Sequence, residues 1–320
     1  MRYFIVGGAG FIGSHFVDAL LYDSKTEKVT IYDNFSYGRE WHYEHHLNDN
    51  RLQVIKANIE DTLTLEKSMV GHNVVIHLAA NPDIAKSSKE PIIDYDLGIA
   101  LTNNVLEAMR KTGAKRLLFA SSACVYGDLG HISATEDYGP LLPISTYGAS
   151  KVAGEVLIYS YCFMFNITAC AFRFGNVVGS RQTHGVGFDF IKKLLNNPKE
   201  LTILGDGTQS KPYIYVTELV NAVLLANEKL TSMFEAYNIS PDDSTTVREI
   251  AELATECLGL KNVEFKYTGG NRGWKGDVPI VRLSPQKITS LGWECTMSSY
   301  DAVKKSINSL IPDIKNGRVK

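Results

Sequence analysis

Tyr147 and Lys151 lie four residues apart, so that both side chains share one face if a helix begins near Thr146. An ammonium group beside a phenol stabilises the tyrosinate and lowers the phenol's pKa from about 10. A tyrosine whose pKa lies near neutrality can serve as a general base. The spacing alone is common by chance, and a pair of residues on a helix surface is the alternative interpretation.

Ser122 follows the apolar run Arg116–Ala120, which is typical of a buried strand. Ligands bind at the carboxyl ends of strands in open parallel sheets. We therefore expect Ser122 to hydrogen-bond a substrate hydroxyl beside Tyr147. A serine that caps a turn is the alternative where no such partner is present.

A glycine-rich turn, Gly7-Gly8-Ala9-Gly10-Phe11-Ile12-Gly13, joins the predicted strand Tyr3–Val6 to a predicted helix. Glycines at such positions permit a tight turn, close approach of a pyrophosphate and close packing of helix on strand. Asp33 ends the next strand, where a carboxylate can accept from both hydroxyls of an adenosine ribose. A 2′-phosphate there would meet a negative charge, so we expect NAD as the cofactor.

The elements that must position these residues alternate between strand and helix in the first half of the chain, which predicts a doubly wound parallel α/β fold. The predicted strands are Tyr3–Val6, Val29–Tyr32, Leu52–Lys56, Val74–His77 and Arg116–Ala120, and the predicted helices include Ile12–Leu21, Thr102–Lys111 and Ser150–Phe165. We expect a Rossmann domain over residues 1–174, rejoined by residues 211–230. A smaller α+β domain, with helices at Thr246–Cys257 and Ser299–Leu310, is expected over residues 175–320.

Composition is that of an ordinary globular protein, with 320 residues, a net charge of −2 and five cysteines. The charge favours neither nucleic acid nor an anionic membrane as a partner. The cysteines form no C-x-x-C pair, which disfavours a disulfide framework or a zinc site. No apolar run reaches the length of a membrane span, and the N-terminus does not resemble a secretion signal. A cytoplasmic protein is expected.

Two further segments allow a structural and a functional interpretation. The helix Ser150–Phe165 is apolar almost all round, which suits either a core helix or one that meets a second copy in a homodimer. In the segment Trp41–His46, His42 and His46 would share a face of a helix and could hold a metal ion. Their spacing matches no known zinc motif, so we favour an exposed polar helix and expect no metal site.

Eight stretches, in order along the chain, resemble extended short-chain dehydrogenases/reductases of the sugar-nucleotide epimerase/dehydratase family. They are GGAGFIG (7–13), HLAA (77–80), TNNVLEA (102–108), SSACVYG (121–127), YGASK (147–151), RFGNVVGSRQ (173–182), LGDGTQ (204–209) and LGW (291–293). The resemblance extends from residue 1 to about residue 295.

The resemblance implies a role for each matching residue. Tyr147 is expected to be the catalytic base, Lys151 to bind the nicotinamide ribose and tune Tyr147, and Ser122 to hold the reacting oxygen. The residues at NAD-binding positions are Gly7, Gly10, Phe11, Ile12, Gly13, Asp33, Asn34, Asn58, Ile59, Ala79, Ala80, Tyr147 and Lys151. The expected substrate-binding residues are Ser122, Asn176, Lys211 and Arg272. Two of these positions depart from the family, since Asn58 replaces an aspartate and Lys211 an arginine.

The resemblance also implies a reaction on a nucleotide-linked sugar, and UDP is the default nucleotide. The family's 4,6-dehydratases carry an acidic residue two positions after the catalytic serine or threonine, where this chain has Cys124. We therefore expect NAD-dependent 4-epimerisation of a UDP-sugar through a transient 4-keto intermediate. Similarity of the SSAC stretch to GDP-mannose 3,5-epimerases leaves a 3,5-epimerase with Cys124 as acid/base open, although a small buried side chain is favoured. An NDP-sugar dehydratase or dehydrogenase and a non-catalytic NAD-binding regulator also stay open.

Overall fold

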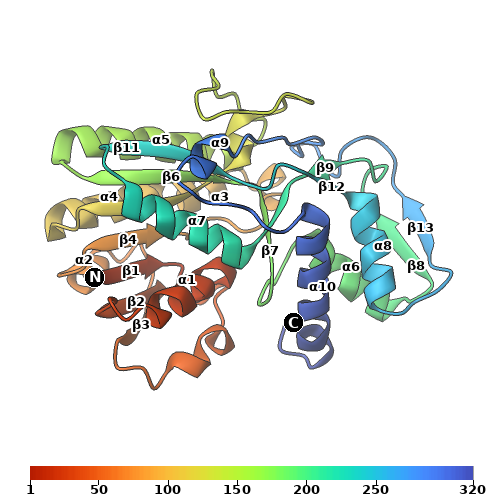
Figure 1. Cartoon of the computed structure of the whole chain (residues 1–320), viewed down its shortest axis with the longest axis horizontal. Coiled ribbons are helices and arrows are strands. Elements are labelled where there is room, and N and C mark those ends of the chain that lie inside the picture. Colours follow the sequence, from red (N-terminus) through yellow and green to blue (C-terminus); the bar gives the residue numbers. More distant parts are fainter. Residues whose placement is uncertain (320) are drawn as a thin grey trace.

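A seven-stranded parallel sheet forms the centre of the protein, as seen in a computed structural model that describes residues 1–319 (Figure 1). The strand order is β11-β6-β5-β4-β1-β2-β3. The chain therefore starts in β1, moves outward to β3, and crosses back over β1 to build the other half of the sheet. This crossover is the doubly wound arrangement that the sequence predicts.

The strands of the sheet are β1 (Arg2–Val6), β2 (Lys28–Asp33), β3 (Leu52–Lys56), β4 (Val74–His77), β5 (Arg116–Ser122), β6 (Thr168–Phe174) and β11 (Phe234–Ile239). The helices that flank it are α1 (Phe11–Tyr22), α2 (Thr62–Met69), α4 (Leu101–Thr112), α5 (Thr146–Phe165) and α7 (Val216–Lys229). Two short turns of helix, α3 (Ile92–Asp94) and η4 (Tyr95–Ala100), lead directly into α4. Within residues 1–319, no helix combines the length and the apolar character needed to cross a bilayer.

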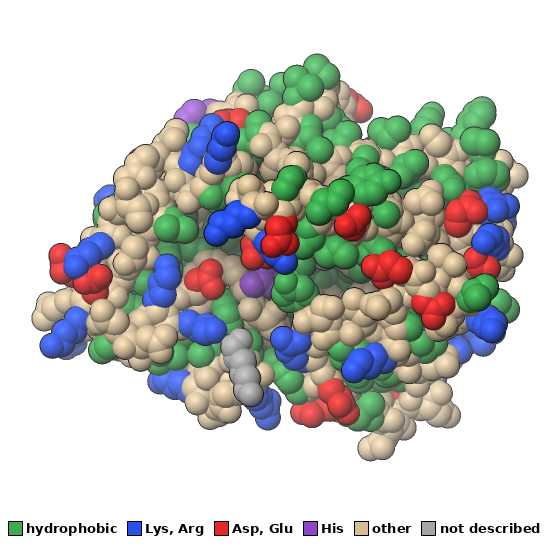
Figure 2. Space-filling view, turned by 180° about the vertical axis from the view of Figure 1, so that it is seen from behind, with side chains coloured by type: hydrophobic (Ala, Val, Ile, Leu, Met, Phe, Trp, Pro, Cys, Tyr) green, Lys and Arg blue, Asp and Glu red, His purple; other side chains and the backbone are tan. Residues whose placement is uncertain are grey.

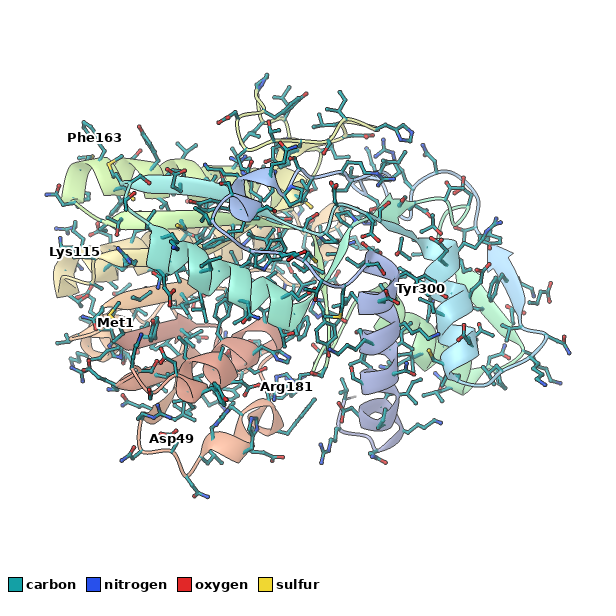
Figure 3. All side chains as sticks on the ribbon, viewed as in Figure 1. Met1, Asp49, Lys115, Phe163, Arg181 and Tyr300 are labelled. Carbon is teal, nitrogen blue, oxygen red and sulfur yellow. The ribbon has the colours of Figure 1, made fainter. Side chains whose placement is uncertain are left out.

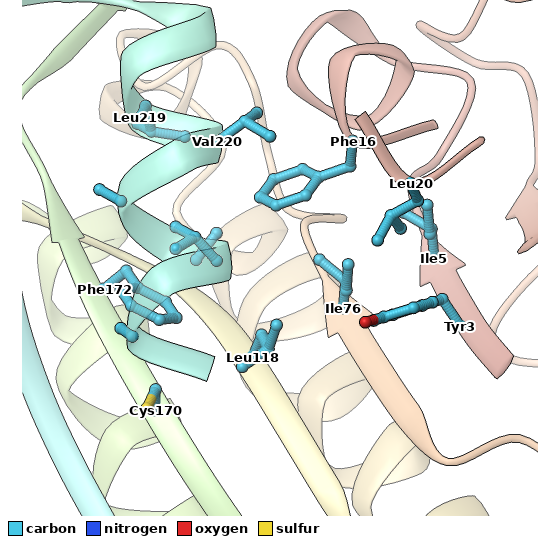
Figure 4. Close-up of a cluster of buried hydrophobic side chains, with 14 of the residues drawn as sticks. Tyr3, Ile5, Phe16, Leu20, Ile76, Leu118, Cys170, Phe172, Leu219 and Val220 are labelled. Atoms are coloured by element: carbon cyan, nitrogen blue, oxygen red, sulfur yellow. The ribbon is translucent and has the colours of Figure 1, made fainter. Parts of the chain in front are cut away.

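Both faces of the sheet are covered, which explains why its strands are continuously apolar. Along β1, Tyr3 and Ile5 belong to the hydrophobic cluster under α1 and α7, whereas Phe4 and Val6 belong to the cluster under α2, α4 and α5. Successive side chains of a strand point to opposite faces, so the two clusters alternate residue by residue. Figure 4 shows the first cluster, in which side chains of α1 and α7 meet over the sheet.

A smaller region beside the sheet carries α6 (Val186–Asn196), α8 (Val247–Cys257) and α10 (Ser299–Lys315), which share a third hydrophobic cluster (Figure 1). Three two-stranded pairs complete it: β7 (Asn176–Val178) with β10 (Tyr213–Tyr215), β8 (Glu200–Ile203) with β13 (Glu264–Tyr267), and β9 (Ser210–Lys211) with β12 (Thr245–Thr246). Phe11, at the start of α1, is buried in this cluster. The glycine-rich turn therefore lies where the two regions meet.

The segment Tyr213–Asn227 separates into two parts. Its helix, α7, covers the sheet beside α1, whereas its strand, β10, pairs with β7 outside the seven-stranded sheet. The strand that joins the sheet from this half of the chain is β11, which pairs in parallel with β6. The division of the chain into domains at residue 174 stays a prediction.

The prediction of one exposed polar helix over Trp41–His46 is wrong. The segment forms two short 3-10 helices, η1 (Glu40–His42) and η2 (Glu44–His46). His42 is fully buried, and its Nδ1 lies 2.8 Å from the carbonyl oxygen of Ala9. His42 therefore supports the glycine-rich turn and does not share a surface with His46.

The turn between β1 and α1 is packed so closely that Gly13 has no room for a side chain. A Cβ atom at Gly13 would lie 2.3 Å from the carbonyl oxygen of Gly7 and 2.7 Å from the Cα of Gly8. These are backbone atoms, which cannot rotate away as a flexible side chain can. Any larger residue at position 13 must therefore move α1 away from β1.

We predict that Gly13→Ala lowers the free energy of unfolding by about 1–3 kcal/mol, because overpacking forces the backbone to shift. Gly187→Ala is the matched control, since Gly187 is also helical and its added Cβ would make an ordinary 3.6 Å contact with Ile307. That control is expected to gain about 0.5–1 kcal/mol. Urea unfolding of both variants measures the difference. Equal stabilities would contradict the steric argument.

Candidate active site

The N-terminus of α1 offers free backbone donors to a ligand. Gly10 is the N-cap residue, no side chain caps the helix, and its first turn holds no acidic residue. The N–H groups of a helix's first turn have no partner within the helix and carry partial positive charge. The donors at Phe11, Ile12 and Gly13 therefore suit an anionic group such as a pyrophosphate.

The glycine-rich turn also approaches the end of the neighbouring strand β4. Gly7 has a positive φ of 84°, and a Cβ there would lie 3.0 Å from the backbone nitrogen of Ala79. Ala79 and Ala80 follow β4, and the Ala79 N–H donates to the carbonyl of Val6 at 3.1 Å. Both alanines are half-buried. The small side chains thus line the edge of the sheet at which a dinucleotide would cross it.

Asp33 lies at the carboxyl end of β2 and is held by backbone donors from two sides. Its Oδ2 accepts from the N–H of Ala9 at 3.0 Å, and its Oδ1 accepts from the N–H of Phe35 at 2.8 Å. Burial raises the pKa of Asp33, although both hydrogen bonds act to lower it. Each oxygen keeps a lone pair that can accept from a ribose hydroxyl. Asn34 is exposed, and its Oδ1 accepts from the N–H of Ser36.

The next loop places Asn58 and Ile59 at the end of β3. The carbonyl of Asn58 accepts from the hydroxyl of Tyr32 at 2.8 Å, so the backbone is fixed while the Asn58 side chain is exposed. Ile59 is buried against the sheet. The residues predicted for the cofactor therefore surround one edge of the sheet, and the donors, the close glycine contacts and the carboxylate fit NAD.

Tyr147, Lys151 and Ser122 meet at the carboxyl end of β5. Helix α5 begins at Thr146 and is capped by Ser145, whose hydroxyl accepts from the N–H of Gly148 at 3.1 Å. This start places Tyr147 in the first turn and Lys151 one turn later. The Nζ of Lys151 donates to the carbonyl of Ala120 at 2.7 Å and lies 5.6 Å from the centroid of the Tyr147 ring.

The protein's own groups shift the pKa values of this pair toward the neutral forms. Burial raises the pKa of Tyr147, while the nearby Ser122 hydroxyl acts to lower it. Burial lowers the pKa of Lys151 to about 8. The expected downward shift at Tyr147 is therefore not produced by the protein alone, because loss of hydration outweighs the hydrogen bond with Ser122.

Cys124 lies between the catalytic pair and the cations predicted to bind the substrate. Burial raises the pKa of its thiol, while Ser122 and the charges of Lys211 and Lys151 act to lower it. The net shift is upward, so the thiol is protonated at neutral pH. A catalytic thiolate needs a shift in the opposite direction.

The two predicted substrate cations are each paired with a carboxylate. Lys211 Nζ lies 2.5 Å from Asp277 Oδ1, and Arg272 Nη2 lies 2.5 Å from Asp128 Oδ2. Arg272 also donates to the backbone carbonyl of Asp277. Asn176 of β7 pairs with Tyr213 of β10, and Tyr213 follows Lys211 by two residues in the chain. Asp277 thus contacts both cations, through its side chain at Lys211 and through its backbone carbonyl at Arg272.

A buried ion pair beneath this site was not predicted from the sequence. Glu155 and Arg173 form two parallel hydrogen bonds, from Nε to Oε1 at 3.1 Å and from Nη2 to Oε2 at 2.7 Å. Each side chain is 7% exposed. Ser121 donates to Glu155 Oε1 at 2.5 Å, so the pair connects α5 to β5 and β6. The signal that could have revealed this pair is in the sequence: Glu155 is the one acidic residue of α5, and Arg173 is the one charged residue of β6.

The network continues from Arg173 toward the edge of the sheet. Arg173 Nη1 donates to the hydroxyl of Tyr126 at 2.9 Å, and Tyr126 donates to Asn238 Oδ1 at 2.7 Å. Asn238 is fully buried in β11, and its Nδ2 donates to the carbonyl of Ala134. Buried polar groups of this kind are stable only when their partners are present. The network therefore holds the segment after Ser122 in place.

We predict that Arg173→Met destabilises the fold by about 3–5 kcal/mol, because it leaves the Glu155 carboxylate buried without a counter-charge. A second substitution in the same chain, Glu155→Gln, removes the unpaired carboxylate and should recover part of the lost stability. Arg110→Met is the control, since the Arg110–Glu107 pair is exposed and worth less than about 1 kcal/mol. Chemical denaturation measures all three. A loss in Arg173→Met no larger than in Arg110→Met would refute the assignment.

Comparison with known proteins places this site within a family. The model of the NAD dependent epimerase/dehydratase family matches residues 3–240. A putative UDP-glucose 4-epimerase of Methanocaldococcus jannaschii is 33% identical over 310 residues, which cover 95% of this chain and 96% of that protein.

Solved structures agree with this relationship. A crystal structure of UDP-galactose 4-epimerase is 38% identical, has a TM-score of 0.87, and covers 98% of this chain and 100% of its own. The UDP-glucose 4-epimerase of Thermotoga maritima, solved with UDP-glucose, is 31% identical, with the same TM-score and the same coverage. Sequence and fold agree, and the chain belongs to the NAD dependent epimerase/dehydratase family.

Proposed function

We propose that this protein is an NAD-dependent 4-epimerase of UDP-sugars. The observation that carries the proposal is the meeting of Tyr147, Lys151 and Ser122 at the carboxyl end of β5, beside the glycine-rich turn. The similar proteins named above are UDP-sugar 4-epimerases, one of them solved with UDP-glucose bound.

Different residues around the glycine-rich turn bind different parts of the cofactor. The N–H groups at Phe11, Ile12 and Gly13 bind the pyrophosphate, and the Asp33 carboxylate accepts from the adenosine ribose. When bound, the cofactor would supply reversible hydride chemistry at C4 of the sugar, with NAD⁺ as acceptor and NADH as donor. Lys151 binds the nicotinamide ribose through its ammonium group.

Tyr147 moves the proton of the sugar's C4 hydroxyl. The positive charge of bound NAD⁺ would stabilise the phenolate of Tyr147, which the protein alone does not. As phenolate, Tyr147 would take that proton when the alcohol becomes a ketone and return it when the alcohol forms again. Ser122 donates a hydrogen bond to the same oxygen and steadies it through both steps. A single base is sufficient because the proton is returned in each turnover. The 4-keto sugar must rotate in the site between the two steps, so that the opposite face of C4 receives the hydride.

The diphosphate of the substrate is bound by Lys211, Arg272 and Asn176. Before the substrate binds, the carboxylates of Asp277 and Asp128 hold the two cations in position. The phosphates then replace these carboxylates as partners of the cations. Charged oxygens of a phosphate make strong hydrogen bonds with both Lys and Arg. Lys211 contributes a single charge and not the two-pronged contact of an arginine.

The residues after Ser122 favour epimerisation over elimination of water. Position 124 holds a cysteine and not an acid, so no carboxylate stands there to protonate a leaving hydroxyl. Burial raises the pKa of the Cys124 thiol, which opposes formation of the thiolate that would abstract a proton from C3 or C5. A 3,5-epimerase with Cys124 as acid/base is therefore less favoured.

We predict that the protein interconverts a UDP-sugar with its C4 epimer in heavy water without placing deuterium on carbon. Mass spectrometry of a nucleotide-sugar panel reports the substrate and the mechanism together. Deuterium at C3 or C5 would support chemistry at Cys124, and loss of water would identify a dehydratase. Turnover of no sugar while NAD remains bound would favour a regulatory NAD-binding protein.

We also predict that Tyr147→Phe lowers kcat by at least about 100-fold, because the proton-transfer group is lost while the fold is kept. NAD should remain bound. Tyr161→Phe is the control, since Tyr161 lies on the same helix but donates to Glu107 on the outer side, away from the site. Full activity in Tyr147→Phe would reject the assigned role.

The outer face of α5 supports a homodimer. Val156, Tyr159, Phe163 and Met164 are 53–74% exposed, and Phe163 lies at the outer end of the helix (Figure 3). Hydrophobic side chains also gather in the upper part of the face shown in Figure 2. Large exposed apolar patches mark contact surfaces. A second copy that packs its own α5 there would cover both faces with one two-fold contact.

We predict that the protein is a dimer and that Phe163→Glu makes it monomeric, because the substitution places a charge in the contact. Leu63→Glu is the matched control, since Leu63 is 68% exposed on α2, outside this face. Sedimentation velocity distinguishes the two states. A wild-type monomer, or a Phe163→Glu dimer, would exclude α5 as the interface.

A further inference from the structure

Three metal-ligating side chains converge on the surface, outside the candidate active site. They are Asp18, in the middle of α1, and His45 and His46, at the end of η2. Both imidazoles lie with Nε2 2.9 Å from the same oxygen, Asp18 Oδ1. The two histidine rings are 4.1 Å apart. Segments that are 27 residues apart in the chain are thus joined at one carboxylate oxygen.

The spacing of the three ligand atoms suits one small ion. One nitrogen from each histidine and one carboxylate oxygen all lie within 4.8 Å of one another. A tetrahedral zinc ion with bonds of about 2.0–2.1 Å holds its ligand atoms about 3.3 Å apart. The two 2.9 Å contacts therefore need to open by only a few tenths of an ångström. The exposed side of the cluster leaves room for water at the remaining position.

The second oxygen of Asp18 is already occupied by a cation. Arg181 Nη1 lies 2.8 Å from Asp18 Oδ2, and Arg181 is largely buried near α1 (Figure 3). This contact orients the carboxylate so that Oδ1 points to the histidines, which is the way in which outer partners orient metal ligands. It also cancels the charge of the carboxylate. A hard cation such as Mg²⁺ or Ca²⁺, which needs several oxygen ligands, is therefore disfavoured.

Two imidazoles and one carboxylate oxygen form a ligand set that zinc accepts with a water in the fourth position. The sequence led us to expect no metal site, and the pair weighed there was His42 with His46; His42 is buried under the glycine-rich turn. His45 takes its place, and the third ligand comes from α1. These ligands could not be recognised from spacing, because they lie on different elements.

We propose that Asp18, His45 and His46 bind a zinc ion that fastens η2 to α1. The segment that η2 belongs to begins at Asp33 and Asn34, the residues placed at the adenosine end of the dinucleotide site. An ion between η2 and α1 limits how far this segment can open. The inference is independent of the reaction at Tyr147, since none of the three ligands reaches that site.

The test measures Zn²⁺ binding by the full-length protein with isothermal titration calorimetry. We expect one ion for each chain, and each of His45→Ala and His46→Ala to weaken its affinity at least about tenfold. His131→Ala is the matched control, since His131 is exposed on a loop away from α1 and should leave the affinity unchanged. Circular dichroism verifies that each variant is folded.

Hydrogen exchange then locates the effect of the ion. Amides of residues 39–47 should exchange more slowly when Zn²⁺ is added to the wild-type protein, and at an unchanged rate in the double variant His45→Ala/His46→Ala. Two results would overturn the proposal: wild-type affinity for Zn²⁺ no higher than that of the double variant, or binding that leaves exchange at residues 39–47 unaltered.

Discussion

The paired hydrogen bonds between Glu155 and Arg173 hold α5, the helix of the candidate site, on the sheet. Glu155 lies one turn after Lys151 and two turns after Tyr147 on α5, and its partner comes from β6. Ser121 of β5 donates to the same carboxylate, so three elements converge on one buried group. Because a buried charge without its partner is costly, this contact restricts α5 to one position on the sheet. The position of Tyr147 and Lys151 relative to β5 follows from it.

Much of the sheet could be predicted, because a strand covered on both faces is apolar throughout. Leu52–Lys56 and Val74–His77 were predicted with the bounds that are observed. The strands β6 and β11 were missed, and each carries a buried polar residue next to its last position, Arg173 and Asn238. Both polar residues are satisfied by partners distant in the chain, which no local pattern reveals. Buried polar residues in β6 and β11 therefore make these two strands hard to recognise in the sequence.

The sequence predicted which residues form the candidate site, but it did not predict their ion pairs or the directions of their pKa shifts. Motif order placed Tyr147, Lys151 and Ser122 together, and the structure brings them to one strand end. The pairing of Lys211 with Asp277 depends on a loop 66 residues away, so it could not be predicted. The upward shift of the Tyr147 pKa depends on burial, which is a property of the folded chain. Sequence motifs thus identify the groups, and packing determines their charge.

The late position of β11 in the chain also affects how the protein is made. Its pairing with β6 means that a central strand of the sheet gains its second neighbour only after residue 239 has left the ribosome. Until then the unpaired edge of β6 carries free N–H and C=O groups, the feature through which nascent chains join to one another. That edge of β6 is therefore protected from such pairing only once β11 has been made and has joined the sheet.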